Sequence, residues 1–101
     1  MKQHDENLIQ TDDASVRIRS LAGNAILPWH YHTEIEDNMF CLTGSIEVQL
    51  RNPDDKIILR PGERCRVDLD RTHRVLNGGS EAASYLLVQG VGKYDFNMVD
   101  D

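Results

Sequence analysis

Short alternating segments separated by turns constrain the fold of this chain more than any other feature. Residues 15–21 (SVRIRSL), 45–50 (SIEVQL) and 63–69 (ERCRVDL) each alternate apolar with polar side chains. A period of two is typical of strands that have one buried face. No run of ten or more residues shows a helical period, so the sequence predicts an all-β fold.

Turn residues divide the strand-like segments at regular intervals. Asn, Pro and Asp cluster in residues 51–55 (RNPDD), while Pro61-Gly62 and Gly78-Gly79 mark two further turns. The apolar residues 83–92 and the weakly alternating residues 93–99 predict two last strands. Even strand spacing favours a sandwich or barrel, and a length of 101 residues indicates a single domain.

The first 14 residues differ from the rest because they are polar and acidic, apart from Leu8 and Ile9. We expect residues 1–14 to form a flexible acidic arm and residues 15–101 to form the domain. A small barrel gains stability by covering an open edge or an apolar outer face. The sequence therefore predicts a homodimer, to which NLIQ in the arm could add a strand.

Composition argues against several classes of partner. The net charge of −6 argues against nucleic acid, which needs a basic face. No apolar run approaches the roughly 18 residues of a membrane span, and the first residues lack the pattern of a signal peptide. We therefore expect a cytoplasmic protein without membrane contact, in which Cys41 and Cys65 stay unpaired.

Three of the four histidines lie in strand-like segments. His30 and His32 are two residues apart, so on a strand they point to the same face with Cα atoms about 7 Å apart. His73 lies in a separate segment. Imidazole nitrogens suit zinc and similar first-row metals, and Glu36 or Asp37 could add a carboxylate. The pattern indicates a site for one divalent transition metal.

The stretch GNAILPWHYHTEIEDNMFCLTG resembles the first motif of the cupin superfamily. His30 and His32 occupy its H-x-H positions, and Gly44 occupies its closing glycine. Counting back from Gly44 by the family spacing reaches Asp37, where the family usually has glutamate. The opening glycine, Gly23, stands one position early.

The stretch PGERCRVDLDRTHRVLN is similar to the second cupin motif. Pro61-Gly62 fills its turn, His73 its histidine and Asn77 its closing asparagine. Asp68 and Asp70 stand where the family has an internal proline and glycine. Together the two motifs span most of the chain.

The resemblance implies a small single-domain, RmlC-like cupin, in which two antiparallel sheets form a jelly-roll β-barrel. It implies that His30, His32, Asp37 and His73 hold iron, manganese, nickel, zinc or copper. It further implies a metal-dependent enzyme of dioxygenase, isomerase or lyase type, acting on a small organic molecule inside the barrel. The alternative is a cupin that binds or senses a small ligand without turnover.

Strand parity separates the two candidate carboxylates. If Asp37 faces inward, Met39 and Cys41 also face inward and form an apolar wall. If Glu36 is the ligand instead, Phe40 lines the pocket. The family spacing favours Asp37, and Glu36 remains the alternative.

Other residues have expected positions outside the site. Trp29 and Tyr31 have the opposite parity to the histidines and are expected to pack on the outer side, and Tyr85 is expected in the core. An arginine that faces the interior would suggest a carboxylate or phosphate substrate. The arginines of residues 15–21 and 63–69 alternate with apolar side chains, so we expect most of them on solvated outer faces.

Overall fold

Ten β-strands form the protein in the computed structural model, which describes residues 2–100. The strands are β1 Gln3–Gln10, β2 Ala14–Leu21, β3 His30–Tyr31, β4 Glu36–Thr43, β5 Ile46–Leu50, β6 Asp55–Leu59, β7 Arg64–Val67, β8 His73–Leu76, β9 Ala83–Gly90 and β10 Asn97–Met98. None of the described residues is helical, so this part of the chain has no helix that could cross a membrane. The all-β prediction is confirmed.

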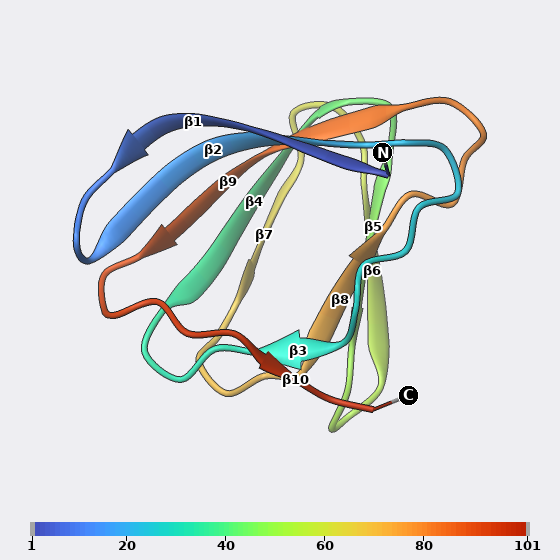
Figure 1. Cartoon of the computed structure of the whole chain (residues 1–101). Helices are drawn as coiled ribbons and strands as arrows, with labels where there is room; N and C mark the ends of the chain where they lie inside the picture. Colours follow the sequence, from blue (N-terminus) through green and yellow to red (C-terminus); the bar gives the residue numbers. More distant parts are fainter. Residues whose placement is uncertain (1, 101) are drawn as a thin grey trace.

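The strands form two antiparallel five-stranded sheets that face each other (Figure 1). The first sheet has the order β1-β2-β9-β4-β7, and the second has the order β10-β3-β8-β5-β6. The chain passes repeatedly between the sheets, for example from β4 in the first to β5 in the second. This is a double-sheet jelly-roll arrangement, as predicted, although the two sheets remain separate rather than closing into one continuous barrel.

The turn between β4 and β5 shows why glycine stands at position 44. Gly44 has a φ of +69°, in the left-handed region that favours glycine. A Cβ built on it would lie 2.8 Å from the Cβ of Ala83, so a larger residue has no room. The turn therefore packs directly against the beginning of β9.

Inward-facing side chains change from apolar to polar along each central strand of the first sheet. From the apolar end to the polar end, they are Leu21, Arg19 and Arg17 on β2; Ala83, Tyr85, Leu87 and Gln89 on β9; and Cys41, Met39 and Asp37 on β4. The apolar ends pack with residues such as Ile46, Val48 and Val75 of the second sheet to form the hydrophobic core. The polar ends surround the other half of the interior, where the candidate site lies.

Strand β2 faces the opposite way from the prediction. Arg17 and Arg19 share their face of the sheet with the buried Tyr85, and each side chain is only 17% exposed. Ile18 instead points outward. The predicted solvated position of these two arginines is wrong, because an alternating pattern defines two faces without showing which one is covered. Arg66, whose side chain is 62% exposed, does lie on an outer face as predicted.

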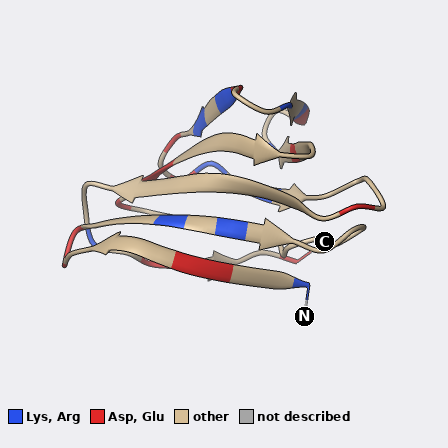
Figure 2. Ribbon diagram, turned by 90° about the horizontal axis from the view of Figure 1, so that it is seen from above, with Lys and Arg blue, Asp and Glu red and all other residues tan. Residues whose placement is uncertain are grey.

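Residues 3–10 form β1, which pairs with β2 at the edge of the first sheet. Figure 2 shows the acidic band of β1 beside the two basic bands of β2. Asp5 is the register partner of Arg19 and accepts hydrogen bonds from its Nε and Nη2 at 2.8 and 2.9 Å. The stretch predicted as a flexible arm thus contributes an edge strand, and the domain boundary at residue 15 remains a prediction.

Candidate metal centre

Three imidazole rings meet at the polar end of the interior. His30 on β3 and His73 on β8 are direct cross-strand partners, and His32 follows β3 immediately. The ring centroids are 4.4 Å apart for His30 and His73, 4.8 Å for His30 and His32, and 5.7 Å for His32 and His73. All three side chains are buried.

Asp37 reaches these rings from β4 in the facing sheet. Its Oδ2 lies 2.7 Å from Nε2 of His73 and 3.3 Å from Nε2 of His32. One potential ligand atom from each of the four residues lies within 4.8 Å of the others. The structure therefore brings together all four residues of the predicted set: His30, His32, Asp37 and His73.

Glu36, the alternative carboxylate, points to the other face of β4. Its side chain is 37% exposed, and its Oε2 lies 3.6 Å from Nε of Arg66. Met39 and Cys41 are buried on the Asp37 side, as strand parity predicted. Of the two candidate carboxylates, only Asp37 reaches the histidines.

Backbone carbonyls fix the orientation of all three rings. Each Nδ1 contacts one carbonyl oxygen: His30 that of Pro28 at 2.9 Å, His32 that of Asp95 at 2.6 Å and His73 that of Arg71 at 2.7 Å. Because a carbonyl only accepts, we assign the proton of each neutral ring to Nδ1, which leaves a lone pair on Nε2. Metal-binding histidines are held in the same way.

When all three rings are neutral, the cluster carries no positive charge to balance the Asp37 carboxylate. With Nδ1 protonated, Nε2 of His73 and Oδ2 of Asp37 are both acceptors, although they lie 2.7 Å apart. Nε2 of His32 is buried and makes no hydrogen bond with any residue that the structure describes. A shared cation, either a proton or a metal ion, would satisfy these three atoms together. The donor set thus fits a metal.

The pKa values of the cluster reflect the same charges. Burial raises the pKa of Asp37, but its close contacts with the rings of His32 and His73 outweigh this effect and hold its pKa well below the usual range. Burial lowers the pKa of His32, but Asp37 more than compensates, so this pKa is raised. Burial and the electrostatic effect of the neighbouring His73 ring lower the pKa of His30 to about 4. Asp37 is therefore ionised and His30 neutral at neutral pH, as metal ligation requires.

Asp70 preserves the bend that precedes His73. It has a φ of +61°, where the family motif has glycine, and aspartate tolerates this region better than most residues. Its N–H donates to the carbonyl of His32 at 2.7 Å. The replacement of the motif glycine therefore leaves His73 in place and ties its loop to the strand of the histidine pair.

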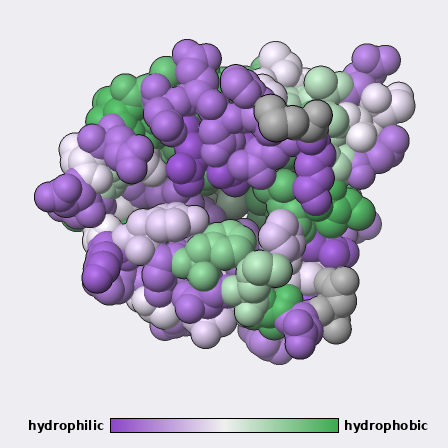
Figure 3. Space-filling view, in the orientation of Figure 1, coloured by the Kyte–Doolittle hydropathy of each residue, from purple (hydrophilic) through white to green (hydrophobic). Residues whose placement is uncertain are grey.

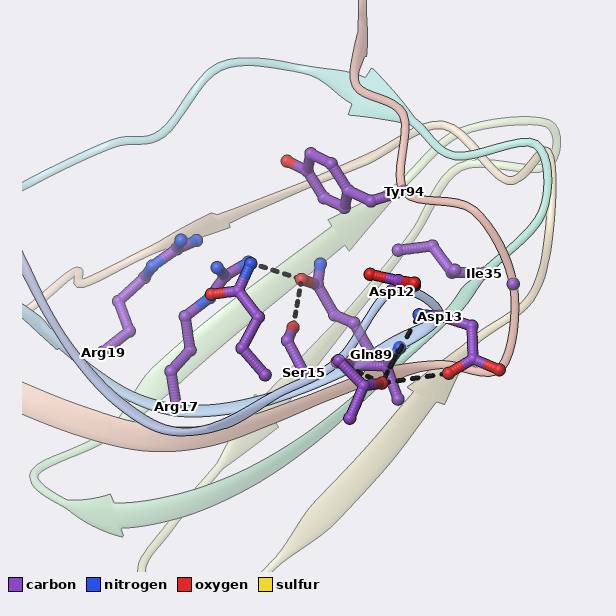
Figure 4. A pocket seen from close by; sticks show the side chains of 12 residues that line it. Asp12, Asp13, Ser15, Arg17, Arg19, Ile35, Gln89 and Tyr94 are labelled. Atoms are coloured by element: carbon purple, nitrogen blue, oxygen red, sulfur yellow. Dashed lines mark hydrogen bonds between the residues drawn. The ribbon is translucent and has the colours of Figure 1, made fainter.

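Gln89 on β9 contacts the carboxylate oxygen of Asp37 that does not face the histidines. Its Nε2 donates to Oδ1 of Asp37 at 2.7 Å, and its Oε1 accepts a hydrogen bond from Nη2 of Arg17 (Figure 4). The sequence prediction did not include Gln89 or Arg17 in the site. The signal for Gln89 was a polar residue on the same strand face as Tyr85 and Leu87.

The segment after β9 covers one side of the cluster. Phe96 stacks on His30 with a centroid distance of 4.4 Å and an interplanar angle of 16°. Tyr94 lies beside His32, with ring centroids 5.6 Å apart. Asp95 supplies the carbonyl that orients His32. Sequence reasoning missed these contacts, because the weak alternation of this segment does not show that it returns across the site.

Trp29 and Tyr31 were predicted to lie outside the site. Neither residue lines the cavity beside the cluster, so this prediction is confirmed. Trp29 is 9% exposed, and the guanidinium carbons of Arg51 and Arg74 lie 4.0 and 4.5 Å from its ring centroid. Tyr85 is fully buried in the core, also as predicted, but it lines the internal cavity as well.

A cavity of about 260 Å³ lies beside the four-residue cluster. The surface is hollowed between the two sheets, with both hydrophilic and hydrophobic residues around the opening (Figure 3). The wall combines apolar side chains with polar ones, namely Leu27, Met39, Val75 and Leu87 with Arg17, Arg19, Tyr85 and Gln89. The volume is below the roughly 300–1,000 Å³ typical of pockets for drug-sized ligands, so the cavity suits a smaller organic molecule.

Comparison with known families agrees with this fold. The family model for the cupin domain matches residues 17–89. The chain therefore belongs to the cupin family. No curated protein matches it.

Solved structures share the fold at low sequence identity. An uncharacterised conserved protein with a double-stranded β-helix domain from Klebsiella pneumoniae is 18% identical, with a TM-score of 0.84 over 99% of this chain and 86% of its own. The polyketide cyclase RemF from Streptomyces resistomycificus is 20% identical, with a TM-score of 0.85 over 99% of this chain and 72% of its own. An oxalate oxidase is 16% identical, with a TM-score of 0.81 over 97% of this chain and 55% of its own.

Proposed function

We propose that His30, His32, Asp37 and His73 hold one divalent transition metal, and that the protein is a metal-dependent enzyme acting on a small organic molecule in the adjacent cavity. The observation that carries this proposal is the buried group of four potential ligand atoms within 4.8 Å of one another. Nε2 of His32, which has no hydrogen-bond partner among the described residues, supports it further.

The donor set narrows the choice of metal. Three imidazoles and one carboxylate suit iron, manganese, nickel, zinc or copper better than calcium or magnesium, which prefer oxygen ligands. Such an ion would supply Lewis-acid chemistry, or redox chemistry if it were iron, manganese or copper.

The residues of the chain prepare the site in three ways. Backbone carbonyls orient the three rings, and Gln89 orients the Asp37 carboxylate. Phe96 covers the face of His30 and limits the access of water to it. These contacts hold the four potential ligands in place before any metal arrives, which lowers the cost of ordering them on binding.

Outside the cluster, no described residue of the cavity wall can act as a general base near pH 7. Outside the cluster, its titratable groups among the described residues are two arginines and two tyrosines: Arg17, Arg19, Tyr85 and Tyr94. Burial raises the pKa of Tyr85 to about 12, and burial also raises the pKa of Tyr94. Chemistry in this cavity would therefore depend on the metal centre. The same observation favours the second candidate function, in which the protein binds or senses a small ligand without turnover.

The structural neighbours support a small-molecule substrate. One neighbour is a polyketide cyclase and another is an oxalate oxidase. At 20% and 16% identity to this chain, these proteins share its fold and do not indicate its substrate.

Metal analysis of protein purified without an affinity tag or chelator tests the proposal. We expect about one equivalent of a first-row metal, and turnover of at least one substrate from a panel of small hydroxy, oxo and carboxylic acids that is lost when the metal is removed. Stoichiometric metal with ligand binding but no turnover would favour the second candidate. Absence of metal, together with unchanged ligand binding after His32→Ala, would overturn both metal-based functions.

We also propose a homodimer formed through the outer face of the first sheet. Ile18, Leu86 and Phe40 lie in one register row across β2, β9 and β4, on the side away from the interior. Glu6 ends this row on β1, and Arg64 ends it on β7. If two copies pack face to face about a two-fold axis parallel to the strands, the row of one copy runs in the opposite direction to that of the other. Glu6 of one copy then lies near Arg64 of the partner subunit, and the apolar side chains of the two rows meet. Cytoplasmic residence and the absence of nucleic-acid and membrane partners stay predictions.

A further inference from the structure

Arg17 and Arg19 line the same cavity as the histidine cluster. Their positions on β2 are two residues apart, so both side chains rise from the same face of the sheet (Figure 4). Asp5 is bonded to Arg19 through Nε and Nη2, and it lies 3.8 Å from Nε of Arg17. Two guanidinium charges therefore face one carboxylate, which leaves one net positive charge on this wall.

Two hydrogen-bond donors on this wall lack an acceptor among the described residues. Nε of Arg17 and the hydroxyl of Tyr85 are buried and make no hydrogen bond to the part of the chain that the structure describes. Tyr85 is fully buried, and its side chain lines the cavity. Burial raises its pKa to about 12, so the hydroxyl keeps its proton and remains a donor at neutral pH. Buried donors are rarely left unpaired, because desolvating them costs free energy.

We propose that Arg17, Arg19 and Tyr85 bind the carboxylate of an organic acid whose other end reaches the candidate metal centre. The proposal names the substrate class for the site described above, and only its metal end rests on the proposed function. The planar guanidinium group matches a carboxylate through paired hydrogen bonds.

Charge favours a carboxylate over a phosphate at this wall. A carboxylate carries one negative charge, equal to the net positive charge of the two arginines and Asp5. A phosphate monoester carries about 1.5 to 2 negative charges near neutral pH and would leave part of its charge uncompensated. The cavity of about 260 Å³ also limits the ligand to a small acid.

A matched pair of probes tests this subsite: 3-hydroxypropionate and its neutral amide, 3-hydroxypropanamide. Calorimetric titration of metal-free protein and of zinc-loaded protein measures the Kd of each. We expect the acid to bind both forms at least tenfold more tightly than the amide, because a charge-assisted hydrogen bond contributes more than a neutral one. Arg17→Gln and Arg19→Gln should each weaken binding of the acid about tenfold or more and leave the amide unchanged. Arg66→Gln, which removes an exposed arginine, should change neither affinity.

Tyr85→Phe separates a binding role from a structural one. It removes only a hydroxyl that interacts with Arg19 and makes no hydrogen bond of regular geometry to the described residues, so the fold should be retained. We expect binding of the acid to weaken about tenfold or more, as for the loss of one hydrogen bond to a charged group. A purely structural tyrosine would leave the affinity of the acid unchanged, which would count against the subsite.

Three results would overturn the proposal: no binding of the acid to either form, equal affinity for acid and amide, or tighter binding of inorganic phosphate than of the acid. The metal content of the same samples is measured independently. Carboxylate binding without any metal affinity would overturn the metal centre and leave this subsite standing. Metal binding without preference for the acid would overturn the subsite alone.

Discussion

Asp37 is the residue that joins the two halves of the candidate metal centre. The histidines belong to the second sheet and the loop after β3, whereas Asp37 belongs to β4 of the first sheet. One of its oxygens contacts His32 and His73, and Gln89 holds the other. Asp37 is the one acidic residue among the described residues that line the cavity, so the charge balance of the centre depends on it.

Asp37→Asn should weaken metal binding more than tenfold, because the amide removes the negative charge of the proposed ligand set. Competition with a calibrated chelator at pH 7.5 measures the affinity. Glu36→Gln is the matched control, since its carboxylate lies on the other face of β4, and we expect it to bind metal like the unaltered protein. A large loss of affinity in Glu36→Gln with no change in Asp37→Asn would show that Glu36, and not Asp37, is the carboxylate ligand.

His32→Ala should abolish stoichiometric metal. The substitution removes one of the four potential ligands and leaves the carbonyl of Asp95 without its donor. Elemental analysis of purified protein measures the metal per chain. His4→Ala provides the control because this histidine is exposed on β1, far in sequence from the motif, and its loss should leave the metal content unchanged. Full metal occupancy in His32→Ala would remove this residue from the site.

At the scale of the element, β2 shows where sequence reasoning stops. Its alternation correctly predicted a strand, and the same reasoning correctly placed Met39 and Cys41 on the inner face of β4. On β2 the inner face carries Arg17 and Arg19, while Val16 and Ile18 face outward. Alternation reports two faces, and which face is buried depends on the neighbouring sheet. A cavity with a polar wall reverses the usual assignment, in which the apolar face is the buried one.

The four potential metal ligands could be predicted because their spacing follows a local motif. The contacts that support them could not, because they join strands that are distant in sequence. Gln89 reaches Asp37 across 52 positions, and Asp95 reaches His32 across 63. Nothing in the residues near positions 89 or 95 indicates which strand will lie opposite. Sequence reasoning therefore identified the four residues of the cluster and missed the contacts that support them.

Strand β1 offers a test of how the edge of the first sheet is held. Asp5→Asn should lower the free energy of unfolding at pH 7 by about 0.5–1 kcal/mol, because a partly exposed ion pair is screened by solvent. Its hydrogen bond from Arg19 lowers the pKa of Asp5 despite the opposing effect of burial. The stabilisation is therefore present above the unfolded pKa of about 3.9 and is lost as the pH falls through the lower folded value.

Urea unfolding of the unaltered protein and of Asp5→Asn between pH 7 and pH 2 measures the difference between their free energies of unfolding. The two free energies should converge at the acid end of the range. Asp54→Asn serves as the control, since this aspartate is exposed in the turn before β6. A difference between Asp5→Asn and the unaltered protein that stays constant down to pH 2 would show that the charge of Asp5 does not stabilise β1.

At the scale of the whole molecule, the two faces of the first sheet carry different tasks. The inner face supplies core residues at one end and cavity residues at the other. The outer face presents apolar side chains in register, including Ile18, Leu86 and Phe40, which are only half-buried in one copy. A small domain buries a modest fraction of its surface, so covering this face would add substantially to its stability.

Leu86→Glu should convert the proposed homodimer to a monomer, because it places a charge at the centre of the apolar row. Size-exclusion chromatography with light scattering measures the mass. Ile58→Glu is the control: Ile58 is 48% exposed on β6 of the second sheet, outside the proposed interface, and its substitution should leave the dimer intact. A monomeric unaltered protein would contradict the homodimer directly.

A charge exchange tests the orientation of the two copies. In the reversed row, Glu6 faces Arg64 of the partner subunit, so Arg64→Glu alone places like charges together and should weaken the dimer about two- to fivefold. Glu6→Arg alone should weaken it similarly. Combining the two substitutions exchanges the charges and should restore most of the affinity, since the row again meets its complement. If the double variant is as weak as the sum of the single ones, Glu6 and Arg64 do not meet, and the sheets pack in another direction.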